Sequence, residues 1–252
     1  MITSREMYDI VRNQLAIDYN CLPMDFERND IIFTKAFKDL GRREMPFGYP
    51  RCEIITMGKS MIVNATDDVL PFLKKNFSKK TKCEILNSPF IYGVNPYYLP
   101  NIENINGITI NNKFTYKIIE HEQIYDFYKF DSLNNALQYN KNSLRPEIIG
   151  IAAFDNKSFV GISCASKDSE KMWQIGVDIL SDYRNNGIAT TIVNMLTREI
   201  LNRGIVPYYT TDSSNIASQR TAISSGYIPA WSHCFRHRLK GGKLSFLNHI
   251  LY

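Results

Sequence analysis

One stretch, residues 173–197, constrains the fold more than any other part of the chain. From Trp173 to Ile179 apolar residues alternate with polar residues or glycine, which is the period of two that a pleated strand requires. From Ile188 to Ile200 the apolar residues instead recur every four positions, which predicts a helix with one apolar face. The stretch is therefore expected to fold as a strand, a tight polar turn and a helix.

The turn between this strand and helix carries the chemical information. A strand that enters a helix through a glycine-containing turn directs several backbone N–H groups one way, with the positive end of the helix dipole behind them. Such a turn can bind a pyrophosphate without many cationic side chains. Gly187 would let the backbone approach an anion closely, and the small side chain of Ala189 would leave room for the anion on the same surface. An ordinary strand-to-helix turn explains these residues alone equally well.

The turn also resembles the acyl-CoA loop of the GNAT N-acetyltransferase superfamily, whose pattern is Arg/Gln-x-x-Gly-x-Gly/Ala. Arg184, Gly187 and Ala189 match this pattern, and the acidic-aromatic pair Asp182-Tyr183 precedes it. The pattern is neither the three-glycine dinucleotide fingerprint nor a P-loop.

A second block supports the resemblance. Residues 215–227 place Asn215 at the start of a helix and a Gly-aromatic pair at its end, as in a later segment of the superfamily. Ser218 replaces the alanine that is usual there. Both blocks occur in the superfamily's order, and the resemblance covers roughly residues 114–250.

The resemblance implies an α/β (α+β) fold with a mixed, mostly antiparallel central sheet flanked by helices. Because residues 87–110 are rich in proline and asparagine, we expect them to be loop, with a domain boundary near residue 110. The chain then divides into a smaller auxiliary α/β domain, residues 1–110, and an acetyltransferase domain, residues 111–252.

Hydrophobic periodicity and turn residues predict the remaining elements. In the first domain the expectation is a helix over 5–17, an irregular stretch to about residue 50, a hairpin of 52–57 with 61–64, and a helix to about Phe77. Thr66, Asp67 and Asp68 are possible caps of that helix, and Asp68 is preferred because it leaves Pro71 in the first turn. The second domain is expected to contain a strand at 114–119, two short helices between 120 and 139, a hairpin of 148–154 with 159–165, a strand at 205–211, a helix from 215 to 226, and a final hairpin of 227–239 with 244–251.

The resemblance further implies acetyl-CoA, or a related acyl-CoA, as co-substrate. Its pyrophosphate would lie on the N–H groups of residues 184–190, and its pantetheine arm would run beside the strand, where a backbone N–H could polarise the thioester carbonyl. Asn215 would hold the pantetheine amide, although a plain helix N-cap explains it as well. The expected binding residues are Val177, Asp178, Ile179, Arg184, Asn185, Asn186, Gly187, Ile188, Ala189, Thr190, Asn215 and Ser218.

The catalytic groups are less well defined. Many superfamily members place a tyrosine acid seven residues after the asparagine, where this chain has Ala222. Asp178, in an otherwise apolar strand, is a candidate base with a raised pKa, or else a hydrogen-bonded carboxylate at the polar end of the strand. Tyr209, Ser213 and His233 are candidates for the missing acid, although a histidine between aromatic residues is more often packed in a core.

Composition limits the alternatives. The net charge of +5 is mild and forms no basic tail, so charge alone does not predict a nucleic-acid partner. The sequence has no run of about 18 apolar residues that would span a membrane and no secretory signal pattern. The five cysteines are scattered without metal-ligand spacing, which favours a reducing cytoplasm and predicts no metal. The abundance of Asn, Lys, Ile and Tyr is typical of an AT-rich bacterial genome.

We therefore expect a cytoplasmic, bacterial N-acetyltransferase that moves an acetyl group from acetyl-CoA directly to a primary amine of a small molecule or peptide. Homo-oligomerisation is left open. The competing hypothesis is a catalytically inactive acyl-CoA-binding or regulatory module of the same fold, which the alanine at position 222 favours. A nucleic-acid-binding protein is a third hypothesis, and only the mild positive charge favours it.

Overall fold

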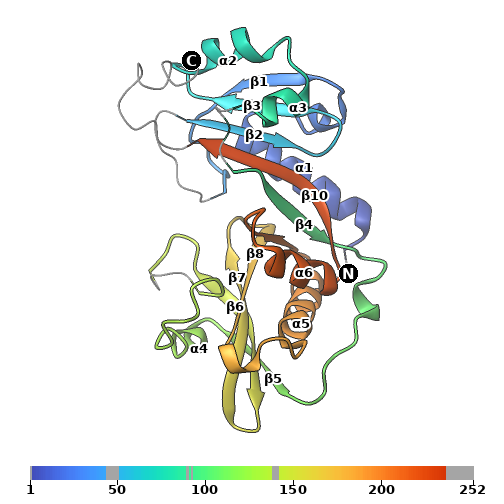
Figure 1. The fold of residues 1–252 in the computed structure, drawn as a ribbon, viewed down its shortest axis with the longest axis vertical. Coiled ribbons are helices and arrows are strands. Elements are labelled where there is room, and N and C mark those ends of the chain that lie inside the picture. The colour runs from blue at the N-terminus through green and yellow to red at the C-terminus, as the bar shows by residue number, and fades with distance from the viewer. Residues whose placement is uncertain (1, 44–50, 89–90, 92, 138–141, 237–252) are drawn as a thin grey trace. The chain divides into compact units, whose positions relative to one another are not determined.

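The computed structural model describes residues 2–43, 51–88, 91, 93–137 and 142–236, and the side chains among them except those of residues 235 and 236 (Figure 1). The contacts divide the chain into two compact units. Of the described residues, those within 2–11, 98–211 and 215–229 form the first unit, and those within 12–97, 212–214 and 230–236 form the second. Contact density does not show which segments fold independently, so the domain boundary near residue 110 stays a prediction.

The first unit is built on a mostly antiparallel sheet, as predicted. Its strand order is β9-β8-β7-β6-β5, in which only β8 and β9 run parallel. The hairpin predicted around residues 155–157 is confirmed, and Asn156 adopts the positive φ of 55° in its turn. The strands are β5 (Thr115–Glu120), β6 (Glu147–Asp155), β7 (Ser158–Lys167), β8 (Met172–Ile179) and β9 (Val206–Thr210).

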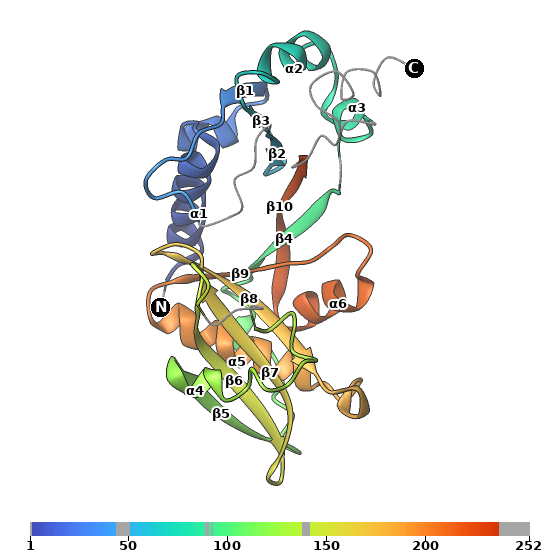
Figure 2. The same cartoon turned by 90° about the vertical axis from the view of Figure 1, so that its left-hand side faces the viewer.

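Helix α5 (Ile188–Asn202) packs along this sheet, as Figure 2 shows. The apolar residues predicted to face the core, Ile188, Ile192, Leu196 and Ile200, are all buried. Complete burial of one such side chain contributes about 1.5–3 kcal/mol. Most of the stability of this helix therefore comes from its apolar face, which fixes where its N-terminus lies relative to β8.

The shorter helices of the first unit surround this sheet. They are η2 (Ile105–Gly107), α4 (Glu122–Tyr125), η3 (Ser181–Tyr183) and α6 (Ile216–Ser224). One of the two short helices expected between residues 120 and 139 is present as α4, and a second one is absent from the described part of that range. Residues 126–137 form successive turns after α4, in which Leu133 and Leu137 are buried. Their apolar spacing reflects packing of turns against the sheet, so helical spacing was a misleading signal here.

The strands of the second unit follow the order β1-β3-β2-β10. The predicted hairpin of β2 and β3 is confirmed, and β10 pairs antiparallel with β2. The element bounds are η1 (Pro23–Glu27), β1 (Ile31–Lys35), β2 (Cys52–Thr56), β3 (Met61–Ala65), α2 (Leu70–Phe77), α3 (Lys82–Leu86) and β10 (Tyr227–Arg236). Helix α1 (Ser4–Tyr19) confirms the predicted first helix, and the second strand of the predicted final hairpin lies outside the described residues.

Three expectations for residues 20–110 were wrong. The stretch assigned as irregular contains β1, which pairs parallel with β3. Its partner is distant in sequence, so no hairpin signal marks it. The loop assigned to residues 87–110 contains β4 (Asn95–Pro100), whose prolines stand at its second and last positions, near the strand ends where proline is tolerated. The N-cap of helix α2 is Val69, so the prediction of Asp68 as the cap was wrong. Thr66 O accepts hydrogen bonds from Val69 N and Leu70 N in the turn that leads into the helix.

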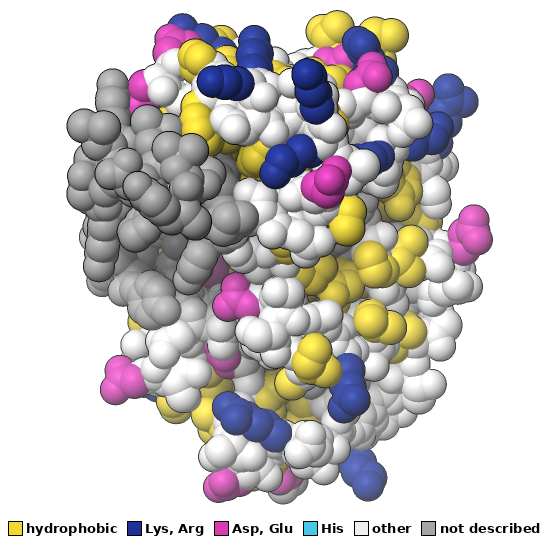
Figure 3. All heavy atoms as spheres, turned by 45° about the horizontal axis from the view of Figure 1, so that its top comes forward, with side chains coloured by type: hydrophobic (Ala, Val, Ile, Leu, Met, Phe, Trp, Pro, Cys, Tyr) yellow, Lys and Arg dark blue, Asp and Glu magenta, His cyan; other side chains and the backbone are white. Residues whose placement is uncertain are grey.

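On the described part of the face drawn in Figure 3, basic and acidic side chains are interspersed and form no patch of one charge. No helix in the described part of the chain has the length and apolarity needed to cross a bilayer. The described side chains also include no group of three or more His, Cys, Asp or Glu residues that could hold a metal ion.

Candidate acyl-CoA site

The end of β8 presents backbone groups along one of its edges. Leu180 N donates to Val160 O at 2.9 Å, and residues 160 and 180 continue the antiparallel register of β7 and β8. Hydrogen-bonded and non-hydrogen-bonded pairs alternate in such a ladder, so the N–H and C=O groups of Val177 and Ile179 point away from β7. The 3.2 Å hydrogen bond from Arg184 Nε to Ile179 O fits this orientation.

The parallel partner on that edge is β9, and its pairing stops early. The register of β8 with β9 runs from Met172↔Val206 to Ile175↔Tyr209. Val177 and Ile179 therefore direct their N–H groups to the β9 side beyond the last pair of the two strands. An acyl thioester placed there would have a rigid backbone donor available for its carbonyl oxygen.

The turn that follows β8 exposes a run of backbone donors. Asn185 and Gly187 both adopt left-handed φ angles, 62° and 73°, and Gly187 caps α5. Turns of this kind make successive N–H groups converge into an anion-binding concavity. Among the described residues, none accepts a hydrogen bond from the backbone N–H of residues 185 to 190. The turn thus combines free N–H groups with the positive end of a long helix.

The turn is held in shape by its own asparagine. Asn186 Nδ2 donates to Tyr183 O and to Arg184 O, both at 3.1 Å. Carbonyl and N–H groups of one trans peptide point in opposite directions. Fixing the carbonyl of Arg184 on the inside of the turn therefore directs the N–H of Asn185 outward.

The start of α6 lies in the same unit and brings together two of the predicted residues. Asn215 is the N-cap of α6, and its Oδ1 accepts from Ser218 N at 3.0 Å. Its Nδ2 has no acceptor within the described ranges. Asn215 therefore caps the helix through one amide atom and keeps the other available for a ligand carbonyl.

Ser218 in turn pairs with Tyr209, a contact that the sequence did not predict. Tyr209 Oη and Ser218 Oγ lie 2.8 Å apart. Burial raises the pKa of Tyr209, so its phenol stays protonated at neutral pH. The position of the usual tyrosine acid is filled by Ala222, which is buried in the core with Tyr227. Tyr209 is thus a buried, protonated phenol beside the first turn of α6.

Asp178 is committed to a different contact. Its Oδ2 accepts from Asn135 N at 2.7 Å and from Ala136 N at 2.8 Å, and its Oδ1 accepts from Asn135 Nδ2 at 2.6 Å. The same segment lies so close to β8 that a Cβ placed on Gly176 would come within 1.8 Å of Asn135 O. The carboxylate therefore fixes residues 135–136 against the strand. No pattern in the sequence predicts this contact, because a turn segment carries no periodicity.

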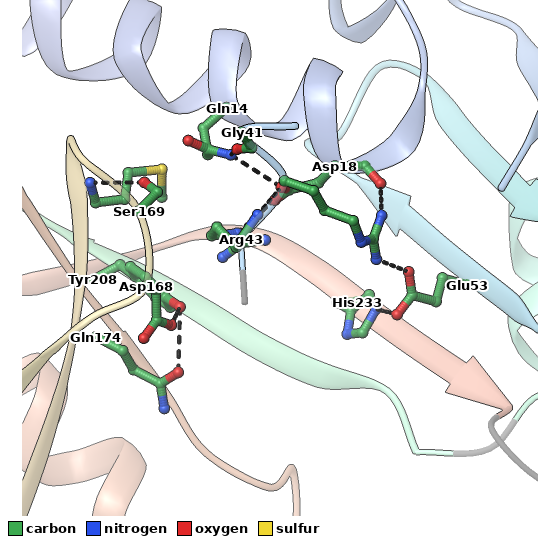
Figure 4. A network of polar contacts seen from close by, with 12 residues as sticks. Gln14, Asp18, Gly41, Arg43, Glu53, Asp168, Ser169, Gln174, Tyr208 and His233 are labelled. Atoms are coloured by element: carbon green, nitrogen blue, oxygen red, sulfur yellow. Dashed lines mark hydrogen bonds and ion pairs between the residues drawn. The ribbon is translucent and has the colours of Figure 1, made fainter. Parts of the chain in front are cut away.

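Ser213 and His233 belong to the second unit. His233 is buried there between the rings of Tyr19 and Tyr97, and its Nε2 lies 3.8 Å from Glu53 Oε1 (Figure 4). Burial alone would raise the pKa of Glu53, but the neighbouring His233 side chain and the hydrogen bond and charge of Arg51 hold that pKa far below its usual range. The proposed roles of Ser213 and His233 as acids stay predictions.

The same view shows a second buried ion pair in this unit. Arg43 Nε contacts Asp18 Oδ2, and Gln14 Nε2 donates to Asp18 Oδ1 at 3.0 Å (Figure 4). Both charged side chains are almost completely buried. Removing one partner of such a pair leaves the other charge uncompensated. These contacts explain the polar residues in the core of the second unit as structural.

Residues 114–227 match the family model described as the acetyltransferase (GNAT) family. The chain therefore carries a GNAT acetyltransferase domain in residues 114–227.

Comparison with solved structures found similar chains among bacterial proteins. An acetyltransferase from the GNAT family of Colwellia psychrerythraea shares 19% identity over 61% of this chain and 59% of its own, with a TM-score of 0.46. A putative acetyltransferase from the GNAT family of Novosphingobium aromaticivorans shares 12% sequence identity over 58% of this chain and 66% of its own, with a TM-score of 0.45. A GCN5-related N-acetyltransferase-like protein of Streptococcus suis shares 16% sequence identity over 71% of this chain and 72% of its own, with a TM-score of 0.45.

The chain thus spans less than two thirds of the length of the first two of these proteins. A search of curated proteins found no match to this sequence.

Proposed function

We propose that this protein is an N-acetyltransferase that transfers an acetyl group from acetyl-CoA to a primary amine by direct attack. The observation that carries the proposal is the run of backbone N–H groups at residues 185–190, which lies inside the segment that matches the GNAT family model. These groups, with the N-terminus of α5, would bind the pyrophosphate. Arg184, Ile188, Ala189 and Thr190 complete the turn and the first helical residues.

The pantetheine arm would follow the edge of β8 toward Val177. Its amide carbonyl would accept from Asn215 Nδ2, and Ser218 would lie one turn further along α6. The acetyl carbonyl oxygen would accept from the N–H of Val177 or Ile179. This donor becomes more valuable as negative charge develops on the oxygen in the tetrahedral intermediate.

The transfer itself needs two proton movements. A neutral amine attacks the carbonyl carbon, and the nitrogen loses a proton to water as the new C–N bond forms. The C–S bond then breaks, and the thiolate of CoA takes a proton from Tyr209 Oη, whose hydroxyl partner Ser218 lies 2.8 Å away. Tyr209 then regains a proton from water, which restores the enzyme. In this proposal Asp178 acts by positioning the segment at Asn135 and Ala136 beside the strand and not as the base.

One observation favours a second candidate, a non-catalytic acyl-CoA-binding module. Ala222 is completely buried where many family members have a tyrosine acid, so no side-chain acid is available from that position. Both candidates require acyl-CoA binding, and they differ only in turnover.

Release of CoA thiol from acetyl-CoA in the presence of a panel of amines separates the two candidates. The panel should include aminoglycosides, polyamines, amino acids and peptides with a free N-terminus. Thiol release that depends on one amine class, with formation of the matching acetyl amide by mass spectrometry, supports the enzyme. Micromolar acetyl-CoA binding without turnover over the whole panel would refute the enzyme and support the module.

A further inference from the structure

A segment ahead of the matched family domain lies against the proposed phosphate turn. Residues 109–113 and the turn line a groove of about 680 Å³, with Gly187 and Thr190 on the helix side. The family match begins at residue 114, so it assigns no role to this segment. The sequence alone indicated only a loop near a domain boundary.

Asn111 is the residue that joins this segment to its surroundings. Its Nδ2 donates to Asn186 O at 2.7 Å, and its backbone N donates to Thr191 Oγ1 at 3.2 Å. Its backbone carbonyl accepts from Tyr116 Oη at 2.6 Å, and its Oδ1 accepts from Lys113 N at 3.0 Å. Every polar group of Asn111 is therefore used, and the contacts reach the turn, helix α5 and strand β5.

The contact with Asn186 O bears directly on the anion site. The carbonyl of Asn186 and the N–H of Gly187 belong to one trans peptide and point in opposite directions. A carbonyl held toward Asn111 therefore directs the N–H of Gly187 away from it. Since Gly187 N–H is among the donors without an acceptor in the described structure, its direction is set from outside the turn by Asn111.

The other contacts make this support rigid. Thr191 is almost completely buried in the first turn of α5, so its hydroxyl is a fixed acceptor that holds the backbone of Asn111 against the helix. Tyr116 belongs to β5, and burial raises the pKa of its phenol, which remains a hydrogen-bond donor at neutral pH. The support is thus anchored to a helix that packs on the sheet and to a strand of the same sheet.

We propose that Asn111 is a positioning residue for acyl-CoA, which orders the pyrophosphate-binding turn by holding the carbonyl of Asn186. This inference rests on the proposed function, because it assigns a residue to the same site. A preorganised turn loses little conformational entropy when the ligand binds. Removing the preorganisation therefore lowers the affinity for the ligand, although no direct ligand contact is removed.

Calorimetric titration with CoA tests the proposal on the full chain. Asn111→Ala removes the donor to Asn186, and one such hydrogen bond changes affinity by about five- to tenfold. Asn111→Asp keeps the size and the acceptor for Lys113 N but cannot donate, so its affinity should fall at least as far. Asn112→Ala is the matched control on the same loop, because Asn112 is exposed. Circular dichroism would confirm that each variant is folded.

A second probe distinguishes turn ordering from general loosening of the site. The probe is 3′-phospho-ADP, which carries the pyrophosphate of CoA without pantetheine. An effect through the turn lowers the affinity for both probes by the same factor. Loosening of the β8 edge that would bind pantetheine would instead lower the affinity for CoA more than the affinity for the shorter probe. That result would overturn the proposal.

The outcomes also separate this inference from the proposed function. A folded wild-type protein that does not bind CoA contradicts the proposed function itself. A wild-type protein that binds CoA together with an Asn111→Ala variant of equal affinity contradicts only the role of Asn111. An equal loss in Asn112→Ala would assign the effect to the loop in general and would likewise overturn the proposal.

Discussion

The carboxylate of Asp178 can be tested as a positioning group against the competing role of general base. Two substitutions separate the roles, because they differ in the hydrogen bonds that they leave. Asp178→Ala removes all three acceptor contacts to Asn135 and Ala136. Asp178→Asn can keep them, since its Oδ1 can accept from the two backbone N–H groups while the amide of Asn135 turns to offer its own oxygen.

The expected magnitudes follow from these contacts. A hydrogen bond contributes about 1 kcal/mol net, and more when it is made to a charged group. Asn135 is exposed, so water replaces part of what Asp178→Ala removes, whereas Ala136 is buried. We expect a local loss of about 2–4 kcal/mol for Asp178→Ala and about 1 kcal/mol for Asp178→Asn.

Amide hydrogen exchange over residues 131–137 measures this loss directly, since local opening controls exchange. Asp178→Ala should exchange about 30- to 1,000-fold faster in this segment, because 1.4 kcal/mol corresponds to a factor of ten. Asp178→Asn should stay within about tenfold of wild type. Turnover should follow the same order, with a large loss only in the alanine variant.

A general base gives the opposite pattern, because asparagine cannot take the proton. Base catalysis contributes about 10²- to 10⁴-fold in rate. An Asp178→Asn variant with wild-type exchange over residues 131–137 and a kcat lowered more than a hundredfold would therefore refute the positioning role.

Three further predictions concern other parts of the chain. Tyr209→Phe should lower kcat about a hundredfold with little change in the KM for acetyl-CoA, and unchanged kcat in steady-state kinetics would remove Tyr209 as the acid. Asn215→Ala should lose about 1 kcal/mol of helix capping and also raise the KM for acetyl-CoA, whereas Asn215→Ser should keep the cap in thermal unfolding and show only the higher KM. Glu53→Gln should cost about 3 kcal/mol at pH 7 in urea unfolding. Because the pKa of Glu53 is lowered on folding, that difference should narrow as the pH falls below its ordinary value of 4.5, and a constant difference would contradict the ion-pair account.

Local patterns were sufficient to predict the elements around the site. The four-residue spacing from Ile188 to Ile200 predicts α5, and the alternation before it predicts β8. Both signals are strong because each element buries one side only, which imposes a period on the sequence. The Asn-Asn-Gly turn between them was also predictable, since those residue types tolerate the positive φ found there.

Contacts between distant segments could not be predicted in the same way. β1 pairs with a strand 30 positions along, as Ile31↔Met61 shows, and has no turn of its own to mark it. The contact of Asp178 with Asn135 joins a strand to a turn, and the contact of Asn111 with Asn186 joins two loops. Such contacts depend on how the sheet brings loops together, and turn residues carry no periodicity that would record a distant partner.

The central claim, that the amide-lined turn before α5 binds acyl-CoA, is tested most directly by calorimetric titration of acetyl-CoA into wild type, Gly187→Trp and Gly204→Trp. Gly187 and Gly204 flank the same helix with the same φ of 73°, and a Cβ at either meets nothing within 4 Å. Both substitutions therefore impose similar backbone strain, but only the first fills the turn. Micromolar binding by wild type and Gly204→Trp, lost in a folded Gly187→Trp, is the predicted result. Equal binding by both variants, or none by a folded wild type, would contradict the claim.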